Sequence, residues 1–218
     1  MKEIWFIRHA ESEGNAGIRT ANTQDNPLTQ KGLKQAEALT THLYFSDEPD
    51  LIIHSKYKRT IQTMQPFVDG LPHNGTPHIP IKEWPVHEYT YLCGKKYANS
   101  TEPERRPAKK IYWGKMDPDY VDGSDAESFS SFARRAHSTI KKLSGHPAKL
   151  IYVYTHGWFI KMVTWILLNE PFYDRLEWNS ETMASVFKYW KAMPFPNTGI
   201  LKVKIDNQGT WLNTWVPK

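Results

Sequence analysis

Short apolar runs alternate along the chain with longer amphipathic stretches. Four runs are rich in Ile, Val, Leu and aromatic residues and are bounded by polar or turn residues, which predicts strands at 3–7, 50–54, 149–154 and 199–205. The first three runs show no regular alternation of polar and apolar residues. Continuous apolar character is typical of central strands that are covered on both faces of a sheet.

Amphipathic stretches with apolar residues at helical spacing separate these runs. Thr29 can cap a helix that runs to about Tyr44, and Ser124 or Asp125 can cap a later one. The later helix carries its apolar residues at Phe129, Phe132, Ala136, Ile140 and Leu143. Further helices are predicted at 58–68, 157–168 and 180–192. Strands that alternate with helices favour an α/β fold, a three-layer sandwich with a mostly parallel central sheet flanked by helices.

The segment 72–123 breaks this alternation. It is rich in Pro, Lys and aromatic residues and shows little periodicity, which predicts an irregular insertion that lies over the sheet edge as a lid. The chain contains no repeat or low-complexity tract, and its 218 residues suit one compact unit. We therefore expect a single domain over 1–218 that carries this insertion.

The net charge of the chain is +5, and it is concentrated in one segment. Residues 95–115 hold seven Lys or Arg and two Asp or Glu, a local charge of +5, so the remaining chain balances to zero. A generally basic surface, as in a nonspecific DNA-binding protein, is therefore excluded, whereas a local anion-facing segment is not. The segment also contains Tyr97, Tyr112 and Trp113, a mixture that suits a phosphorylated substrate with an aromatic or sugar portion, or RNA.

No feature of the sequence indicates secretion or a membrane. Cys93 is the single cysteine, so no internal disulfide can form. The longest apolar stretch, around 162–168, is too short to span a bilayer. The short apolar run at the N-terminus is followed by charged residues rather than by a signal-peptide cleavage region. We expect a cytoplasmic protein with no membrane partner.

Two histidines follow directly on predicted strands. The first strand runs into Arg8 and His9, and the third leads to His156 and Gly157. Ligands of open α/β sheets bind at the carboxyl ends of strands. Imidazole is nucleophilic at neutral pH and arginine binds phosphate oxygens through its planar fork, so this pairing suits phosphoryl transfer. Arg59 opens the helix after the second strand and is expected at the same edge of the sheet.

Four sequence blocks resemble motifs of the histidine phosphatase superfamily, the phosphoglycerate-mutase-like proteins. The blocks are IRHAESEGN at 7–15, PLTQKGLKQA at 27–36, HSKYKRTIQT at 54–63 and YTHG at 154–157, in the family's order. The segment 16–26 lacks the tryptophan-rich block typical of the glycolytic mutases. The chain therefore resembles the phosphatase branch of the family.

The resemblance implies that His9 is the nucleophile and becomes phosphorylated. It implies a phosphate pocket lined by Arg8, Arg59 and His156, with assistance from Asn15 and the backbone of Gly157. It also implies a reaction in two steps that needs no metal and no cofactor, namely phosphoryl transfer to His9 and then hydrolysis by water.

Other positions in these blocks leave alternatives open. Ser55 matches the family's serine before the second arginine, but a serine at the end of a strand also suits a turn or a cap. Ser12 can donate to phosphate or bond the loop backbone. Many relatives place a Gln donor twelve residues after the nucleophile, where this chain has Ala21, so Asn22 or Gln24 is the candidate replacement.

The family also uses an acid, usually a glutamate after the second helix, that protonates the leaving oxygen. Glu88 in WPVHEYTYL is the candidate, because an aromatic setting would raise its pKa toward the protonated form near neutrality. Glu83 is the alternative. Two further features are interpreted as structural. The segment 196–199 resembles a loop that approaches the site in relatives but is interpreted as a plain turn, and Arg134 with Arg135 is interpreted as a solvated helix surface.

These features predict a metal-independent phosphomonoesterase that acts through a phosphohistidine on a small phosphorylated metabolite. A phosphoglycerate-type phosphomutase is one alternative, although the family's mutases carry insertions and a longer tail that this chain lacks. A catalytically quiet module that binds a phosphorylated ligand or nucleic acid is another. His9 and Glu88 together argue against the quiet module, because a binding protein needs neither a nucleophile nor an acid. We expect no nucleic-acid partner, and the sequence leaves the natural substrate and the oligomeric state open.

Overall fold

A single mixed sheet organises the chain in a computed structural model that describes residues 1–22, 25–71, 79–169 and 177–217. Its strands are β1 (Lys2–Arg8), β2 (Leu51–His54), β3 (Ile81–Glu83), β4 (Leu150–Thr155), β5 (Ile200–Asp206) and β6 (Gly209–Trp215). Their order across the sheet is β3-β2-β4-β1-β5-β6. Strands β3, β2, β4 and β1 pair in parallel, and β5 and β6 pair antiparallel at the other edge. The prediction of a mostly parallel sheet is confirmed.

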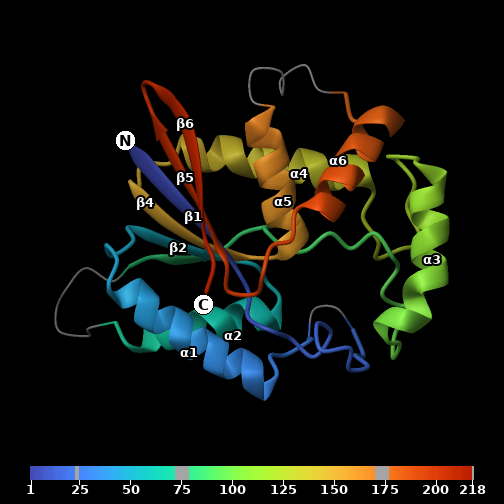
Figure 1. The fold of residues 1–218 in the computed structure, drawn as a ribbon, viewed down its shortest axis with the longest axis horizontal. Helices are drawn as coiled ribbons and strands as arrows, with labels where there is room; N and C mark the ends of the chain where they lie inside the picture. The colour runs from blue at the N-terminus through green and yellow to red at the C-terminus, as the bar shows by residue number, and fades with distance from the viewer. Residues whose placement is uncertain (23–24, 72–78, 170–176, 218) are drawn as a thin grey trace.

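Helices cover both faces of this sheet (Figure 1). They are α1 (Gln30–Tyr44), α2 (Lys58–Asp69), α3 (Glu102–Lys115), α4 (Phe129–Ser144), α5 (Gly157–Leu168) and α6 (Ser180–Ala192). Helices α1 and α2 lie on one face, and α4, α5 and α6 lie on the other. The three-layer arrangement is therefore confirmed. Among the described residues, no helix is long and apolar enough to cross a membrane.

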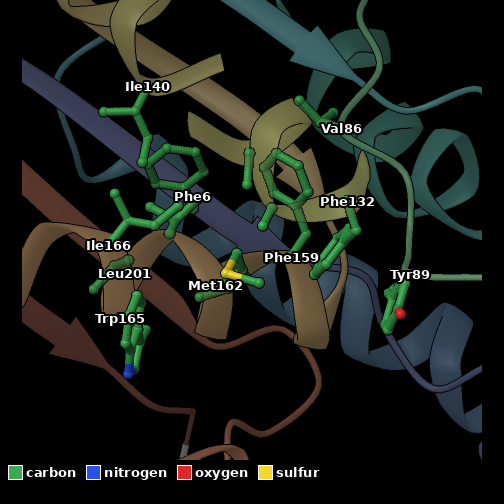
Figure 2. Close-up of a cluster of buried hydrophobic side chains, with 14 of the residues drawn as sticks. Phe6, Val86, Tyr89, Phe132, Ile140, Phe159, Met162, Trp165, Ile166 and Leu201 are labelled. Carbon is green, nitrogen blue, oxygen red and sulfur yellow. The ribbon is translucent and has the colours of Figure 1, made fainter. Parts of the chain in front are cut away.

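Strand β1 supplies side chains to two separate hydrophobic cores. Ile4 and Phe6 pack with α4 and α5, and Figure 2 shows Phe6 next to Ile140 and Ile166. The intervening residues of the strand point to the α1 and α2 side of the sheet. Because successive side chains of a strand point to opposite faces, a strand covered on both faces needs apolar residues at every position. This requirement explains why the strand showed no alternation of polar residues.

The predicted helix boundaries are largely confirmed, with one wrong cap. Thr29 caps α1 and accepts a hydrogen bond from the backbone of Gly32, as expected. Helix α4, in contrast, begins at Phe129 and is capped by Ser128, not by Ser124 or Asp125. The carboxylate of Asp125 instead accepts from the backbone N–H of Lys95 at 3.1 Å. The apolar spacing located the helix, but Asp125 is engaged by another segment.

The described part of the insertion at 72–123 is less irregular than expected, although most of its residues lie outside helices and strands. It contains the short strand β3 and the 14-residue helix α3, which begins with a capping box between Thr101 and Glu104. Two prolines and a largely charged surface concealed this helix, because only Tyr112 and Trp113 of α3 are buried. The portion of the insertion at 72–78 lies outside the described residues.

Strand β6 was also missed. It lies at the edge of the sheet, and none of its residues is fully buried. A strand that buries little apolar surface carries little hydrophobic signal, so the pattern of the sequence does not reveal it.

Candidate active site

His9 and His156 lie at the carboxyl ends of two neighbouring parallel strands. Strands β1 and β4 pair so that Arg8 stands opposite Thr155, and the backbone N–H of His9 donates to the Thr155 carbonyl at 3.0 Å. The centroids of the two imidazole rings lie 5.1 Å apart, with the rings edge to face. The structure thus brings together two histidines that are 147 positions apart in the sequence (156 minus 9).

Arg59, in the first turn of α2, joins these two rings. Its Nε lies 3.1 Å from Nε2 of His9, and its Nη2 lies 3.0 Å from Nδ1 of His156. A guanidinium only donates, so both of these imidazole nitrogens accept. The side chain is buried at 4% exposure, and its guanidinium also lies 4.8 Å from the centroid of the Tyr57 ring.

The second ring nitrogen of His9 fixes its tautomer. Nδ1 lies 2.7 Å from the carbonyl oxygen of Ala10, and because a carbonyl only accepts, Nδ1 carries the proton. Burial, and then the charges of Arg59 and Arg8, lower the pKa of His9 well below its ordinary value. The ring is therefore neutral near pH 7, with a lone pair on Nε2 that faces Arg59.

His156 has the opposite tautomer. Its Nδ1 accepts from Arg59, and its Nε2 lies 2.7 Å from Oγ of Ser55, so Nε2 donates to that hydroxyl. The hydroxyl of Ser55 also lies 2.9 Å from Oγ1 of Thr60, and Ser55 is fully buried. Burial, followed by the charge of Arg59, lowers the pKa of His156 well below its ordinary value. Ser55 thus contacts the histidine and lines no described cavity.

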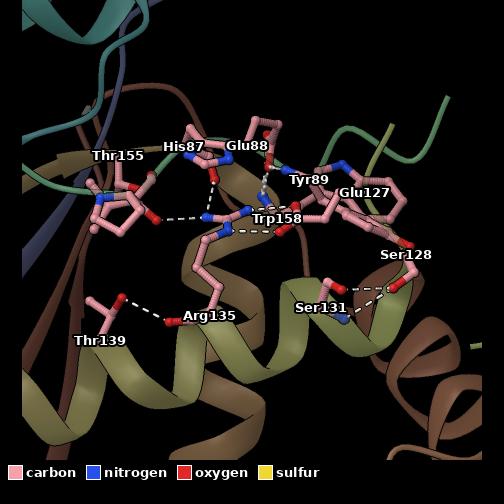
Figure 3. A network of polar contacts seen from close by, with 12 residues as sticks. His87, Glu88, Tyr89, Glu127, Ser128, Ser131, Arg135, Thr139, Thr155 and Trp158 are labelled. Carbon is pink, nitrogen blue, oxygen red and sulfur yellow. Dashed lines mark hydrogen bonds and ion pairs between the residues drawn. The ribbon is translucent and has the colours of Figure 1, made fainter. Parts of the chain in front are cut away.

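Glu88 is held by backbone donors next to this cluster (Figure 3). Its carboxyl group accepts from the N–H groups of Tyr89 and Trp158, each at 3.1 Å. Burial raises the pKa of Glu88, against the opposing charges of Arg59 and Arg8 and these backbone donors. A raised pKa favours the protonated form of the Glu88 carboxyl group, which is the form that a general acid needs. The alternative acid, Glu83, is exposed on β3 and lines none of the described cavities.

A cavity of about 250 Å³ opens above the cluster. Its lining includes Arg59 and Glu88 from the buried cluster and Ser12, Asn15 and Asn22 from the loop after β1. The basic segment 95–115 contributes Arg105 and Lys109 to the same lining. His9 and His156 lie beneath, with exposures of 2% and 0%. The cavity is therefore a partly polar pocket with cations along its wall.

Arg8 faces a different cavity. It lines a hollow of about 560 Å³ together with 196–198 and does not line the pocket that Glu88 lines, although its charge still acts on His9 and Glu88. One of its nitrogens donates to the carbonyl of Phe195, while its Nε is buried without a hydrogen-bond partner among the described residues. Gly157 packs directly beside it, since a Cβ at Gly157 would lie only 3.1 Å from Nε of Arg8.

Comparison with known proteins gives the family of the chain. The family model described as "Histidine phosphatase superfamily (branch 1)" matches residues 4–217. The chain belongs to the histidine phosphatase superfamily. Its predicted resemblance is confirmed over nearly the whole chain.

Individual relatives of the chain are distant. It is 38% identical over 79 residues to a mannitol-1-phosphatase of Eimeria tenella. This alignment covers 32% of this chain and 26% of the relative. It is 26% identical over 163 residues to a metal-independent phosphoserine phosphatase of Arabidopsis thaliana. This alignment covers 74% of this chain and 66% of the relative. The chain thus spans less than two thirds of the length of either curated relative.

Solved structures share the fold of the chain. YhfR of Bacillus stearothermophilus superposes with a TM-score of 0.72 at 20% identity, over 97% of this chain and 95% of that one. At this level of identity the likeness shows the fold alone.

Asn197 lies at the candidate site, although its segment was interpreted as a plain turn. Its Nδ2 donates to the carbonyl of His9 at 2.8 Å and to Oδ1 of Asn15 at 3.1 Å. The same Oδ1 of Asn15 lies 3.2 Å from the hydroxyl of Ser12. The interpretation of 196–199 as a plain turn is therefore wrong, because this loop holds the backbone of His9 and the predicted phosphate donor Asn15.

The replacement for the family's Gln donor is resolved only in part. Asn22 lines the cavity, and its Nδ2 donates to the carboxylate of Asp25 at 2.7 Å. Gln24, the other candidate, lies outside the described residues.

Arg135 is another residue whose position was not expected. It makes a two-pronged ion pair with Glu127, at 2.8 and 2.7 Å, and donates to the carbonyls of Pro85 and His87 at 2.7 and 3.0 Å (Figure 3). The expectation of a solvated side chain is wrong for Arg135, because α4 packs against the segment that carries Glu88. The helical spacing placed it on an outer face but could not show what covers that face.

Proposed function

We propose that this histidine phosphatase is a metal-independent phosphomonoesterase that acts through a phosphohistidine at His9 on a small phosphorylated metabolite. The observation that carries the proposal is the lone pair on Nε2 of His9, next to Arg59 at 3.1 Å and fixed by the bond from Nδ1 to Ala10. A neutral imidazole in this tautomer is a nucleophile once Nε2 exchanges its hydrogen bond from Arg59 for the phosphorus atom.

In the first step, Nε2 of His9 attacks phosphorus, and the bond between phosphorus and the ester oxygen breaks. Glu88 gives its proton to the leaving alcohol, because an alkoxide is a poor leaving group. In the second step, water attacks phosphorus, the Glu88 carboxylate takes a proton from that water, and the bond to Nε2 breaks. Inorganic phosphate leaves, and both residues return to their starting protonation.

The other site residues stabilise charge on the phosphoryl group in this proposal. Arg59 and His156 form the base of the phosphate site, and donors from the loop after β1, namely Ser12, Asn15 and Asn22, close it from above. Arg8 does not line the pocket and acts on the site through its charge, which bears on His9 and Glu88, and the backbone N–H of Gly157 completes the site. Ser55 acts through His156 rather than by touching substrate, because its hydroxyl is already bonded to that ring.

The names of the curated relatives support a substrate with an alkyl phosphate ester. One is a mannitol-1-phosphatase and the other a phosphoserine phosphatase. An alkyl leaving group requires an acid, and Glu88, whose pKa is raised by burial, is the candidate for that role. As part of the proposal we place the enzyme in the cytoplasm, where its single cysteine, Cys93, stays a free buried thiol.

Phosphate release tests the proposal. The protein is incubated with p-nitrophenyl phosphate and a panel of phosphorylated metabolites in the presence of a chelator, with His9→Ala as the control. Chelator-resistant phosphate release that is lost in His9→Ala supports the phosphomonoesterase. Turnover only with a bisphosphate primer and without net phosphate release would identify a mutase. No turnover together with salt-sensitive binding of RNA would identify a binding module.

A further inference from the structure

A second hollow lies beside the catalytic cavity, between α3, α5 and α6. It has a volume of about 560 Å³, and we call it the lysine groove. Its apolar lining consists of Tyr91, Trp113, Trp158, Phe187 and Trp190. Its charged lining consists of Lys109, Lys110, Lys161 and Lys191. Among the described residues that line the groove, none is acidic.

The lysine groove is continuous with the catalytic cavity on the side of Glu88. Tyr91, Lys109 and Trp158 line both hollows. The backbone N–H of Trp158 also holds the Glu88 carboxyl group at 3.1 Å. Lys161, one turn further along α5, is close enough that the charge of Glu88 opposes the lowering of its pKa by burial and by Arg8. Because the acid stands where the leaving group departs, the groove extends from the leaving-group side of the site.

The apolar wall of the groove is rigid. Trp113 is stacked between Phe187, with centroids 4.1 Å apart, and Trp158, with centroids 5.7 Å apart. The ring of Trp190 meets that of Trp158 edge to face at 4.6 Å. Rings that are already packed lose little conformational freedom when a ligand binds, so this wall suits a flat apolar group.

Two of the four lysines are available to an anion. Lys109 is paired with Glu102 at 2.8 Å, and Lys161 donates to the carbonyl of Trp190 at 2.9 Å. Lys110 and Lys191 are exposed and form no ion pair with any residue in the described part of the chain. The ammonium group of Lys191 lies 4.3 Å from the centroid of the Phe187 ring, at the groove wall. The positive rim is therefore not neutralised by the protein itself.

We propose that the lysine groove binds the leaving group of the substrate, and that this leaving group carries an aromatic ring and a second anionic group. This proposal rests on the proposed function, since it places the phosphate ester in the catalytic cavity. The phosphate and the atoms next to it occupy the cavity of about 250 Å³, the ring lies along Trp158 and Phe187, and the second anion meets Lys110 and Lys191.

A matched pair of substrates tests this assignment. Naphthyl phosphate and naphthyl phosphate with a sulfonate on the ring remote from the ester differ only in the second anion. We expect the sulfonate to raise kcat/KM about fivefold, which is the size that exposed ion pairs support. In the double variant Lys110→Gln/Lys191→Gln the ratio of the two kcat/KM values falls to about one. The control Lys115→Gln/Lys188→Gln removes the same charge from the same two helices outside the groove and keeps the wild-type ratio.

The outcomes separate this proposal from the proposed function. A sulfonate preference that survives in Lys110→Gln/Lys191→Gln, or that is lost equally in the control variant, would overturn the groove assignment while leaving the phosphatase intact. Equal kcat/KM values for both substrates in the wild-type protein would overturn it too. Failure to hydrolyse either substrate or p-nitrophenyl phosphate contradicts the proposed function itself. Calorimetric binding of the two naphthyl phosphates to His9→Ala then still tests the groove, because binding needs no turnover.

Discussion

Nε of Arg59 lies 3.1 Å from Nε2 of His9, so the arginine donates to the atom that we propose as the nucleophile. The same guanidinium reaches Nδ1 of His156 at 3.0 Å. One buried cation therefore sets the acceptor nitrogens of both rings, and it disfavours protonation of either ring. The contact keeps His9 neutral in the free enzyme and leaves a positive charge where the phosphoryl group would arrive.

Glu88→Gln should slow the hydrolysis of alkyl phosphates more than that of aryl phosphates. Loss of a general acid costs about 10²–10⁴-fold where the leaving group needs a proton. Aryl leaving groups need protonation less, so the substitution should lower the rate with aryl phosphates by a smaller factor. The measurement is kcat/KM for phosphoserine and for p-nitrophenyl phosphate. Glu83 is an exposed glutamate on β3, so the variant Glu83→Gln is the control and should keep both rates. Equal losses of kcat/KM for both substrates in Glu88→Gln would remove Glu88 from the acid role.

The pH profile of kcat/KM should follow from the protonation states of His9 and Glu88. The first step needs His9 neutral and Glu88 protonated. Because the pKa of His9 lies well below 6.5, activity falls on the acidic side only at pH values well below 6.5. Because the pKa of Glu88 is raised, the protonated acid persists above its ordinary range and activity falls as pH rises through that raised value. With an aryl substrate, Glu88→Gln should lose this alkaline fall, and an unchanged alkaline limb would assign it to another group.

Ser55→Ala should destabilise the protein and weaken the preference of His156 for one tautomer. The buried Nε2–H of His156 loses its acceptor, at a cost of about 1–3 kcal/mol in the free energy of unfolding. Denaturant unfolding measures this loss, and the ring nitrogen chemical shifts of His156 report the tautomer. Ser130→Ala is the matched control, because the Ser130 hydroxyl is equally buried and has no hydrogen-bond partner among the described residues. An identical effect of the two substitutions would contradict a specific role for Ser55.

Gly157→Ala should lower kcat/KM without lowering stability. A Cβ at this position would lie 3.1 Å from Nε of Arg8 and push the guanidinium aside. Displacement of a charge-stabilising group by a fraction of an ångström should cost about tenfold in kcat/KM. Gly145→Ala is the control, since its Cβ would meet only the carbonyl of Lys141 at an ordinary 3.6 Å. Wild-type activity in Gly157→Ala would show that the position of Arg8 does not matter.

The sequence predicted those parts of the site that follow directly on apolar strands. Arg8, His9 and His156 are examples, because a buried strand has a strong hydrophobic pattern and ligands gather at its carboxyl end. The α3 helix was not predicted, because only Tyr112 and Trp113 of its residues are buried and an exposed charged helix resembles a loop in composition. Most of its stability comes from packing that is visible only in three dimensions.

Contacts between distant segments were also beyond the sequence. Asn197 reaches Asn15 across 182 positions, and no local pattern distinguishes such an asparagine from one in a plain turn. Asp125 looked like a helix cap, but it binds the backbone of Lys95, which lies 30 positions away. A polar side chain can satisfy several partners equally well, and the fold decides which partner is near.

A covalent phosphate on Nε2 of His9 is the most direct test of the whole account. The enzyme is mixed with p-nitrophenyl phosphate, quenched at alkaline pH during turnover, and analysed by intact-protein and peptide mass spectrometry. We predict an acid-labile phosphoryl group on the peptide that contains His9, which is absent from His9→Ala. Turnover at the wild-type rate in His9→Ala, or a phosphoryl group trapped on a different residue, would contradict the account.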